Sequence, residues 1–500
     1  MSCHYTNQRA VVTMDGLLGL RLKVRRCVNR GCARFHRAFR PEAEGALVLP
    51  QQEFGLDLIA LVGRLRYVTR ASVPEIHAEL VRRGVMISER SVTNLLDRYD
   101  ELVATAMTDP GHLRTRFADQ GRVVLAIDGL QPEVGHEVLW VIRDCLSGTV
   151  VLARALLSST AADLKPLLCQ AAESVGVPVT GVVSDGQRSI RIAVAKALPG
   201  VPHQLCHFHY LREAAHPIFE ADRHAKKELK KRIRGIRPIE RAVEGRQDAE
   251  ADLVQGYCAA VRSAVTDDGR APLDAGGLKL KARLEAVADS LQRVDKKGGP
   301  TKPIQDLSRL IGCALQETAP LWPDIKRAFG WVHRAAHILN NTEALPAPTV
   351  ARRLDGLCGA LCRHRACAGD LADGVDHFLK VTRSYRPGLF HCHAVADLPG
   401  TNNGLEGLFG SYRYCQRRTT GRRSASSATV VRGPARLVAS VTSHLAPLDA
   451  SDLAAVDRTR WQAMRTDITA RRLQRTRGSR FRRDPEAYLR KLEAQYAAAK

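Results

Sequence analysis

The stretch from residue 122 to residue 213 alternates apolar runs with amphipathic segments, and this order constrains the fold more than any other feature. The apolar runs are RVVLAIDGLQ (122–131), two strands within 137–157 joined by a turn at Ser147–Gly148, a strand within 177–190, and a strand that enters PHQLCHFHYLRE (202–213). An amphipathic helix is expected over 162–176, and a second helix before 202. The order strand, strand, strand, helix, strand, helix, strand predicts an α/β domain with a mixed sheet.

Two of these apolar runs end in aspartate. Asp128 and Asp185 lie at the carboxyl ends of strands that are expected to be neighbours, and each is followed by glycine. There they can hold hard divalent cations through oxygen. A single aspartate after a strand is more often a turn or cap residue, and Asp144 is interpreted in that way because it stands just before Ser147–Gly148.

The 500-residue chain is strongly basic, with 76 Lys and Arg against 52 Asp and Glu, a net charge of +24. This charge favours a polyanionic partner, since released counterions drive such binding. About half of the excess lies in residues 416–500. The alternative is an Arg-rich composition with solvated faces. No apolar run is long enough for a membrane span. The start lacks signal-peptide order, so an unexported, cytoplasmic protein is expected.

The first 50 residues contain a cluster of metal-ligand residue types in a segment that is expected to be irregular. Cys27 and Cys32 flank Gly31 in CVNRGC, and Cys3, His4 or His36 can complete a tetrahedral zinc site. Residues 1–50 are therefore interpreted as a zinc-ribbon-like, zinc-binding segment that gains folding energy from the metal. The alternative is two free cysteines at the surface.

Residues 51–110 have the pattern of a helix-turn-helix domain. A helix is expected over 54–67, a second one capped by Ser72 and ended by Gly84, and a third one capped by Ser88. This spacing predicts a recognition helix whose outward residues meet base edges in the major groove. The outward residues near its start are Arg90, Ser91, Thr93 and Asn94. An ordinary helical hairpin is the alternative.

Three motifs carry a resemblance to a known family. They are AIDGL with Asp128, VVSDGQRSIRIAVAKALPGVPHQLCHFH with Asp185 and the pair Cys206 and His209, and TNNGLEGLFGSYR with Glu406. Together they resemble the DD(E/D) transposases of bacterial insertion sequences, in the Mutator-like superfamily with a Cys-x-x-His motif. The resemblance implies a ribonuclease H-like catalytic core. Cys206 and His209 are interpreted as a structural pair that packs beside the active centre, and half of a zinc site is the alternative.

The resemblance also implies a domain order and a metal centre. The catalytic core would comprise residues 118–211 and return over 396–425, interrupted by a helical insertion at 212–395. A basic helical region would follow at 426–500. Asp128, Asp185 and Glu406 would hold two Mg²⁺ or Mn²⁺ ions for in-line displacement at a phosphodiester.

Two basic segments are candidates for contact with the DNA backbone. One is a helix over 223–241, and the other follows Glu406 directly. The residues expected to bind DNA are Lys226, Lys227, Lys230, Lys231, Arg417, Arg418, Arg422 and Arg423. A solvated helix face is the alternative interpretation of the first segment.

The function expected from these features is DNA transposition. The chain would bind terminal inverted repeats and target DNA as double strands, act as a homodimer or larger homo-oligomer, and associate with the nucleoid rather than with a membrane. Two alternatives stay open: a transposase-derived regulator that binds DNA without catalysis, and a structure-specific nuclease of the same fold.

Overall fold

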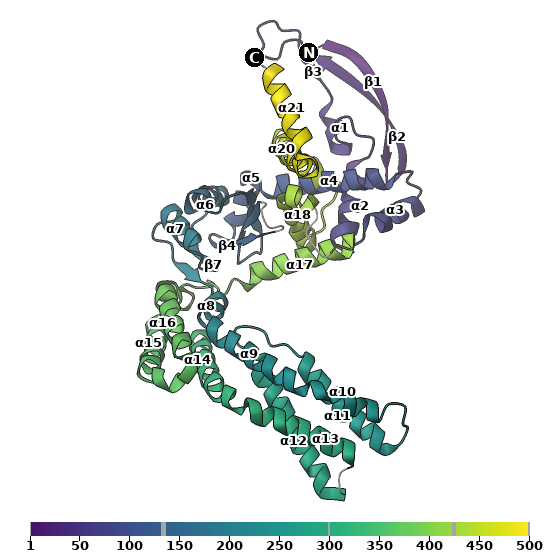
Figure 1. Cartoon of the computed structure of the whole chain (residues 1–500). Helices are drawn as coiled ribbons and strands as arrows, with labels where there is room; N and C mark the ends of the chain where they lie inside the picture. The colour runs from purple at the N-terminus through teal and green to yellow at the C-terminus, as the bar shows by residue number, and fades with distance from the viewer. Residues whose placement is uncertain (1, 132–136, 299–300, 423–426, 499–500) are drawn as a thin grey trace. The chain divides into compact units, whose positions relative to one another are not determined.

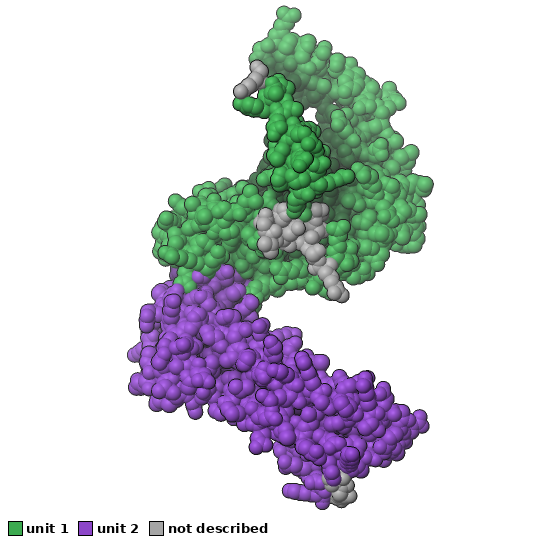
Figure 2. All heavy atoms as spheres, viewed as in Figure 1, with its two compact units in different colours: residues 1–182, 187–201, 403–500 green, residues 183–186, 202–402 purple. Residues whose placement is uncertain are grey.

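The computed structural model describes residues 2–131, 137–298, 301–422 and 427–498 (Figure 1). Its contacts divide the chain into two units, which Figure 2 distinguishes by colour. Unit 1 consists of residues 1–182, 187–201 and 403–500, and unit 2 consists of residues 183–186 and 202–402. The fold is mixed α/β and mostly helical, as expected for the α/β class.

The N-terminal segment is a sheet, so the expectation of an irregular segment is wrong. Strands β1 (Ser2–Thr13) and β2 (Gly16–Arg26) form a long antiparallel hairpin, and β3 (Ala38–Phe39) pairs with the end of β2. In β2, Leu22 and Val24 are buried while their sequence neighbours are exposed. This alternation of buried and exposed residues is typical of a half-buried strand. The charged residues of this segment made the pattern hard to recognise from the sequence.

Five helices follow in unit 1, and two of them, α3 and α4, begin where the cap residues predicted. They are α1 (Glu42–Leu47), α2 (Leu56–Tyr67), α3 (Val73–Arg82), α4 (Glu89–Met107) and α5 (Pro110–Ala118). Ser72 caps α3 in a capping box with Glu75, and the Ser88 side chain accepts a hydrogen bond from the backbone N–H of Ser91 at the start of α4. The turn between α3 and α4 contains Gly84 at φ +81°, a conformation that favours glycine.

The expected order of strands and helices is confirmed. The elements are β4 (Val123–Leu130), β5 (Val138–Asp144), β6 (Val150–Leu156), α6 (Ala161–Val175), β7 (Val179–Ser184), α7 (Arg188–Ala197) and β8 (His203–Leu205). They form a five-stranded sheet with the order β6-β5-β4-β7-β8, in which β4, β5 and β6 are antiparallel. The odd-numbered residues Val123, Leu125 and Ile127 pack with α6 and α7 in one core.

Unit 2 is built almost entirely of helices, as expected for the insertion (Figure 1). The α-helices are α8 (His207–Ala214), α9 (His216–Arg232), α10 (Ile236–Ala242), α11 (Ala249–Thr266), α12 (Gly276–Gly298), α13 (Lys302–Thr318), α14 (Trp322–Asn340), α15 (Ala347–Arg363) and α16 (Ala372–Tyr385). The 3₁₀ helices are η1 (Ile233–Gly235), η2 (Ala319–Leu321), η3 (Arg365–Leu371), η4 (Arg386–Gly388) and η5 (His391–His393). One continuous apolar core runs from Leu205 to Leu389.

The chain then returns to unit 1 and ends in helices that pack on its N-terminal part. They are α17 (Asn403–Thr420), α18 (Ser427–Leu445), α19 (Ala450–Ala454), α20 (Arg458–Arg483) and α21 (Pro485–Ala498). Ala439, Leu453, Val456 and Trp461 belong to the same apolar core as α2, α3 and α4. The basic C-terminal region is therefore part of the body that contains the helix-turn-helix pattern.

Among the described helices, none combines the length and the apolar character that crossing a membrane requires.

Candidate functional site

Asp128 lies on the face of the central strand opposite the α6 and α7 core. On β4 the odd-numbered residues face that core, so Ala126, Asp128 and Leu130 face the other way. Asp128 pairs with Val141 across the β4–β5 ladder, and Ala126 pairs with Arg143. Arg143 therefore shares the face of Asp128. The Asp128 carboxylate is half-buried and accepts a hydrogen bond from the backbone N–H of Gly129 at 2.7 Å.

Helix α17, which carries Glu406, packs against this face of β4. Arg143 Nη1 donates a hydrogen bond to the carbonyl oxygen of Gly404 at 2.7 Å, and Gly404 is in the first turn of α17. Glu406 is half-buried, and its Oε1 atom is fully covered. The structure thus brings the Asp128 strand and the Glu406 helix together within unit 1, although the two residues lie far apart in the sequence (Figure 1).

Asp185 is the first residue after β7, and the chain enters unit 2 at Val183. Its carbonyl oxygen accepts a hydrogen bond from the Tyr385 hydroxyl at 3.2 Å, and that hydroxyl also lies 2.7 Å from Glu213 Oε2. Gly186 follows at φ +87°, and a Cβ there would lie 2.6 Å from the Tyr385 ring. Only glycine fits both the backbone conformation and the space, which explains the Asp-Gly order at this strand end.

Asp144 has the turn role that its position in the sequence predicted. Its side chain is fully buried and accepts hydrogen bonds from the backbone N–H groups of Val124 and Ser147, at 3.0 and 2.7 Å. The Ser147 hydroxyl donates a further one at 2.8 Å. A carboxylate so fully used by the β5–β6 turn is a structural residue, so it does not compete with Asp128 for the metal role.

Cys206 joins two segments of unit 2 at the start of α8. The residue is fully buried, its backbone N–H donates to Ser184 O at 2.8 Å, and its Sγ accepts a hydrogen bond from the backbone N–H of Asn402 at 3.2 Å. These bonds hold the end of β7 and the residues just before α17 at one point. His209 is half-buried and its ring meets that of Phe208 edge to face.

The residues that were expected to contact bases are at the start of α4. Arg90, Thr93 and Asn94 are exposed, and Ser91 is half-buried. The Thr93 hydroxyl is bonded back to Glu89 O at 3.0 Å, and the Ser91 hydroxyl lies 3.1 Å from that of Ser88. The inward residues Val92, Leu95 and Leu96 are buried, as the helical spacing predicted.

The structure corrects the prediction that Lys226 on α9 contacts DNA. Lys226 is 6% exposed, and its ammonium group is bonded to Asp267 O and to Asp268 Oδ1. This lysine cannot reach a phosphate backbone, because the helix turns it toward the loop after α11. Lys227 and Lys231 are exposed, and Lys230 is half-buried.

The arginines after Glu406 extend along α17 and beyond it. Arg417 and Arg422 are exposed. Arg418 Nη2 donates to Glu75 Oε1 at 3.0 Å, which links α17 to α3, the second helix of the helix-turn-helix pattern. Arg423 lies outside the described residues.

The structure does not bring all the predicted N-terminal zinc ligands together. The pKa of the Cys32 thiol is lowered, first by a hydrogen bond from the Arg34 backbone N–H and then by the Cys27 side chain. Cys3 lies on β1 opposite Arg25. Within the described ranges, the ligand atoms of Cys3, Cys27, Cys32 and His36 form no group of three within 4.8 Å. The expected set of four ligands is therefore not assembled, and zinc binding there stays a prediction.

Sequence reasoning missed two sets of residues. Arg143 was regarded only as part of a strand, although the alternation of side chains along β4 and β5 places it on the face of Asp128. His207 was passed over between Cys206 and His209, although it lies beside the histidine-rich segment HCH at 391–393 in the structure. Nothing local in the sequence links residue 207 to residue 392.

Comparison of the chain with protein-family models and with curated proteins found no match.

Proposed function

We propose that this protein is a DNA transposase that cleaves and joins DNA strands at a metal-dependent centre formed by Asp128, Asp185 and Glu406. The observation that carries the proposal is the packing of α17, which contains Glu406, against β4, which contains Asp128, within unit 1. The element order of the sheet supports it, since this order is the one expected from the resemblance to DD(E/D) transposases. Strand β7, which Asp185 follows, is the neighbour of β4 in the sheet.

The donor set fits a hard divalent cation. Asp128 and Glu406 offer carboxylate oxygens, which are the ligands that Mg²⁺ and Mn²⁺ prefer. When bound, such ions polarise the phosphoryl oxygens and lower the pKa of a bound water or 3′-hydroxyl. Asp128 lies within strand β4 and Glu406 in the first turn of α17, so rigid elements of unit 1 hold these two groups, while Asp185 directly follows β7. Arg143 positions the first turn of α17 through the Gly404 carbonyl.

The helix-turn-helix pattern and the basic surface supply the proposed DNA contacts. Arg90, Thr93 and Asn94 present donors and acceptors on the outward side of α4. A cavity between α4 and α20 is lined by Thr93 and by arginines that include Arg472 and Arg475. Double-stranded element ends and target DNA are the proposed partners. Because two ends must be paired, we also propose at least a homodimer.

The test is strand cleavage of a supercoiled plasmid by the full-length protein in Mg²⁺ or Mn²⁺. The plasmid carries the DNA that flanks the protein's own gene. Asp128→Asn, Asp185→Asn and Glu406→Gln should each lower the cleavage rate by at least about 100-fold, because each removes one ligand from the centre. Glu220→Gln, a change at a half-buried residue of α9 whose carboxylate pairs with Arg223, is the matched control and should cleave like the parent.

The outcomes separate the proposal from its alternatives. Equal cleavage by the three carboxylate variants and the parent would remove the catalytic centre and leave a DNA-binding regulator. Cleavage that depends on the carboxylates but shows no preference for the flanking DNA and yields no joined products would indicate a nuclease. Metal-dependent joining of flanking ends to a second duplex is the result expected from a transposase.

A further inference from the structure

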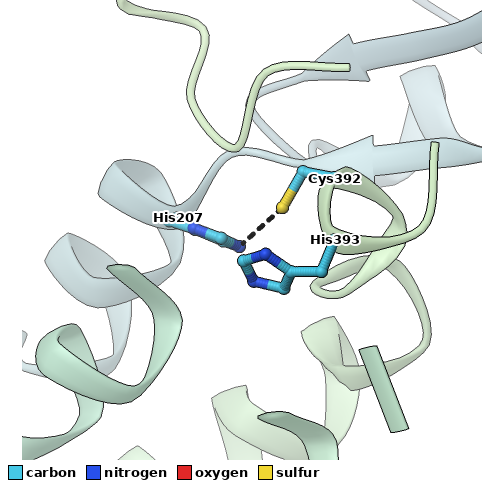
Figure 3. Close-up of side chains that lie close together, drawn as sticks. All are labelled: His207, Cys392 and His393. Atoms are coloured by element: carbon cyan, nitrogen blue, oxygen red, sulfur yellow. Dashed lines mark hydrogen bonds between the residues drawn. The ribbon is translucent and has the colours of Figure 1, made fainter. Parts of the chain in front are cut away.

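Three side chains of unit 2 form a group of soft and borderline metal ligands, shown in Figure 3. They are His207, Cys392 and His393, and their ligand atoms all lie within 4.8 Å of one another. In the part of the chain that the structure describes, no other group of three or more His, Cys, Asp or Glu side chains meets this criterion. All three residues belong to unit 2, so the group is defined within one body.

The three residues come from two segments that the fold holds side by side. His207 is the first residue of α8, directly after β8, whereas Cys392 and His393 lie in η5. The Gln204 side chain joins the segments: its Oε1 accepts the backbone N–H of Cys392 at 2.9 Å, and its Nε2 donates to Leu389 O at 3.2 Å. The Gln204 side chain therefore holds the two segments beside each other.

The distance between the His207 and Cys392 ligand atoms is close to that in a tetrahedral zinc site. His207 Nε2 lies 3.9 Å from Cys392 Sγ, and Figure 3 shows the His393 ring beside both atoms. Zn–N and Zn–S bonds of tetrahedral geometry place their N and S atoms about 3.5 Å apart. His207 Nε2 also lies 2.7 Å from the Leu389 carbonyl oxygen and 3.1 Å from Gln204 Nε2, so a metal bound at this atom replaces these contacts. His393 Nε2 is moreover buried and has no hydrogen-bond partner among the described residues, which is an uncommon state for a buried ring nitrogen.

The absence of a side chain at position 400 lets the backbone approach the group closely. A Cβ at Gly400 would lie 3.0 Å from His207 Nδ1 and 3.4 Å from Cys392 Sγ. The Gly400 carbonyl oxygen accepts the backbone N–H of His207 at 2.9 Å, which fixes this close approach. Any residue other than glycine at this position would therefore crowd His207 and Cys392.

We propose that His207, Cys392 and His393 bind one zinc ion in unit 2, with a fourth position left for water. One thiolate and two imidazoles are a ligand set that selects zinc over magnesium or calcium. The site does not depend on the proposed transposase activity. Its role is to join the start of α8 to the segment that leads to α17, and so to fix the last part of unit 2 before the chain continues toward Glu406.

The test measures metal content and thermal stability of the full-length protein. All variants carry Cys27→Ser and Cys32→Ser, so that the N-terminal cysteines do not contribute. In this background the protein should retain one equivalent of zinc after dialysis, and Co²⁺ in its place should give the visible bands of a thiolate-ligated tetrahedral ion. Adding Cys392→Ser or His393→Ala should remove both signals. Added zinc should raise the melting temperature only while the site is intact.

Two further variants serve as controls. Cys358→Ser changes another half-buried cysteine of unit 2 and should leave the zinc equivalent and the Co²⁺ bands unchanged. Gly400→Ala crowds His207 and Cys392 and should weaken zinc binding, while circular dichroism shows the parent's helix content. Equal zinc content with and without Cys392→Ser, or no zinc in the Cys27→Ser and Cys32→Ser background, would overturn the proposal.

Discussion

A single guanidinium connects the central sheet to the helix that carries Glu406. Arg143 Nη1 donates to the Gly404 carbonyl at 2.7 Å, and a Cβ at Gly404 would lie 3.1 Å from Arg143 Nη2. The arginine is half-buried and lies on the face of Asp128. In the proposed centre it is a positioning residue, because it sets how the first turn of α17 meets β4 without contacting the reacting phosphodiester.

Arg143→Met should therefore lower the rate of metal-dependent cleavage while DNA affinity stays near the parent value. A loss of roughly 10- to 100-fold is expected, because small displacements of catalytic groups have effects of that size. The measurement is the cleavage rate at saturating DNA, together with binding to the same duplex. Arg154→Met is the control, since Arg154 is an exposed arginine of β6 bonded to Gln170. Equal losses in both variants would contradict a positioning role.

Asp100 gives the folded state a pH dependence. Burial, as the largest cause, raises the pKa of this carboxyl to about 6, against its usual value of 3.8, although Arg436 and a hydrogen bond from Tyr67 oppose the shift. The folded state thus holds the proton more tightly than the unfolded state. The stabilisation from the protonated carboxyl is complete below about pH 4 and is lost as the pH rises through about 6.

Asp100→Asn removes this titration and so provides the test. Urea unfolding at several pH values should show the parent losing stability relative to the variant between about pH 4 and 6. The relative loss is expected to be of the order of 1–3 kcal/mol. Parallel pH profiles for the two proteins would show that Asp100 does not titrate in this range.

At the scale of elements, the sequence predicts those helices and strands whose position depends on neighbouring residues in the chain. The strands β4 to β8 were recognisable because apolar runs alternate with turns, and the starts of α3 and α4 because Ser72 and Ser88 are cap residues. The approach of Glu406 to the Asp128 strand was expected only from the resemblance, since no local pattern brings α17 to β4. Gly186 was noted as a repeated Asp-Gly order, but its contact with Tyr385 depends on the tertiary fold.

Two features were not predicted from the sequence, the burial of Lys226 and the packing of the C-terminal helices on α4, and the physical reasons differ. Lys226 follows Asp222 by one helical turn and lies on the buried stripe of α9 with Ala225 and Leu229, so periodicity contained a signal that a count of charges ignored. The packing of α18 and α20 on α4 had no such signal. It depends on pairs such as Arg432 with Glu101, which only the tertiary fold brings together.

These pairs make the joint between the N- and C-terminal helices sensitive to substitution. Glu101 is 2% exposed and accepts hydrogen bonds from Arg432 at 2.6 Å and from Trp461 Nε1 at 3.0 Å. Arg432→Met should lower the free energy of unfolding by about 3–5 kcal/mol, because a buried carboxylate loses its closest cation. Arg418→Met breaks an exposed pair with Glu75 and should cost at most about 1 kcal/mol. Chemical denaturation of both variants measures the difference, and equal losses would contradict the argument.

At the scale of the whole molecule, the effect of the net charge of +24 on DNA binding depends on which Lys and Arg side chains are exposed. Many arginines are paired with carboxylates inside unit 1, among them Arg432 and Arg436 with Asp97, so the formal charge overstates what a DNA backbone meets. The exposed lysines of α9 remain a candidate contact, because Lys227 and Lys231 are exposed while Lys226 is buried. Lys226 and Lys227, neighbours on the same helix, are therefore a matched pair of positions for testing DNA contact.

Binding to a fixed DNA duplex over a range of salt concentrations distinguishes the two lysines. If α9 lies along the phosphate backbone as proposed, Lys227→Gln should reduce the slope of log affinity against log salt by about 0.9, since one phosphate contact and its released counterion are lost. Lys226→Gln should leave that slope unchanged and should instead lower the thermal stability of unit 2, because Asp268 loses its closest cation. An unchanged slope for Lys227→Gln would exclude this residue from the DNA contact and assign the electrostatic part of binding to other basic surfaces of the chain.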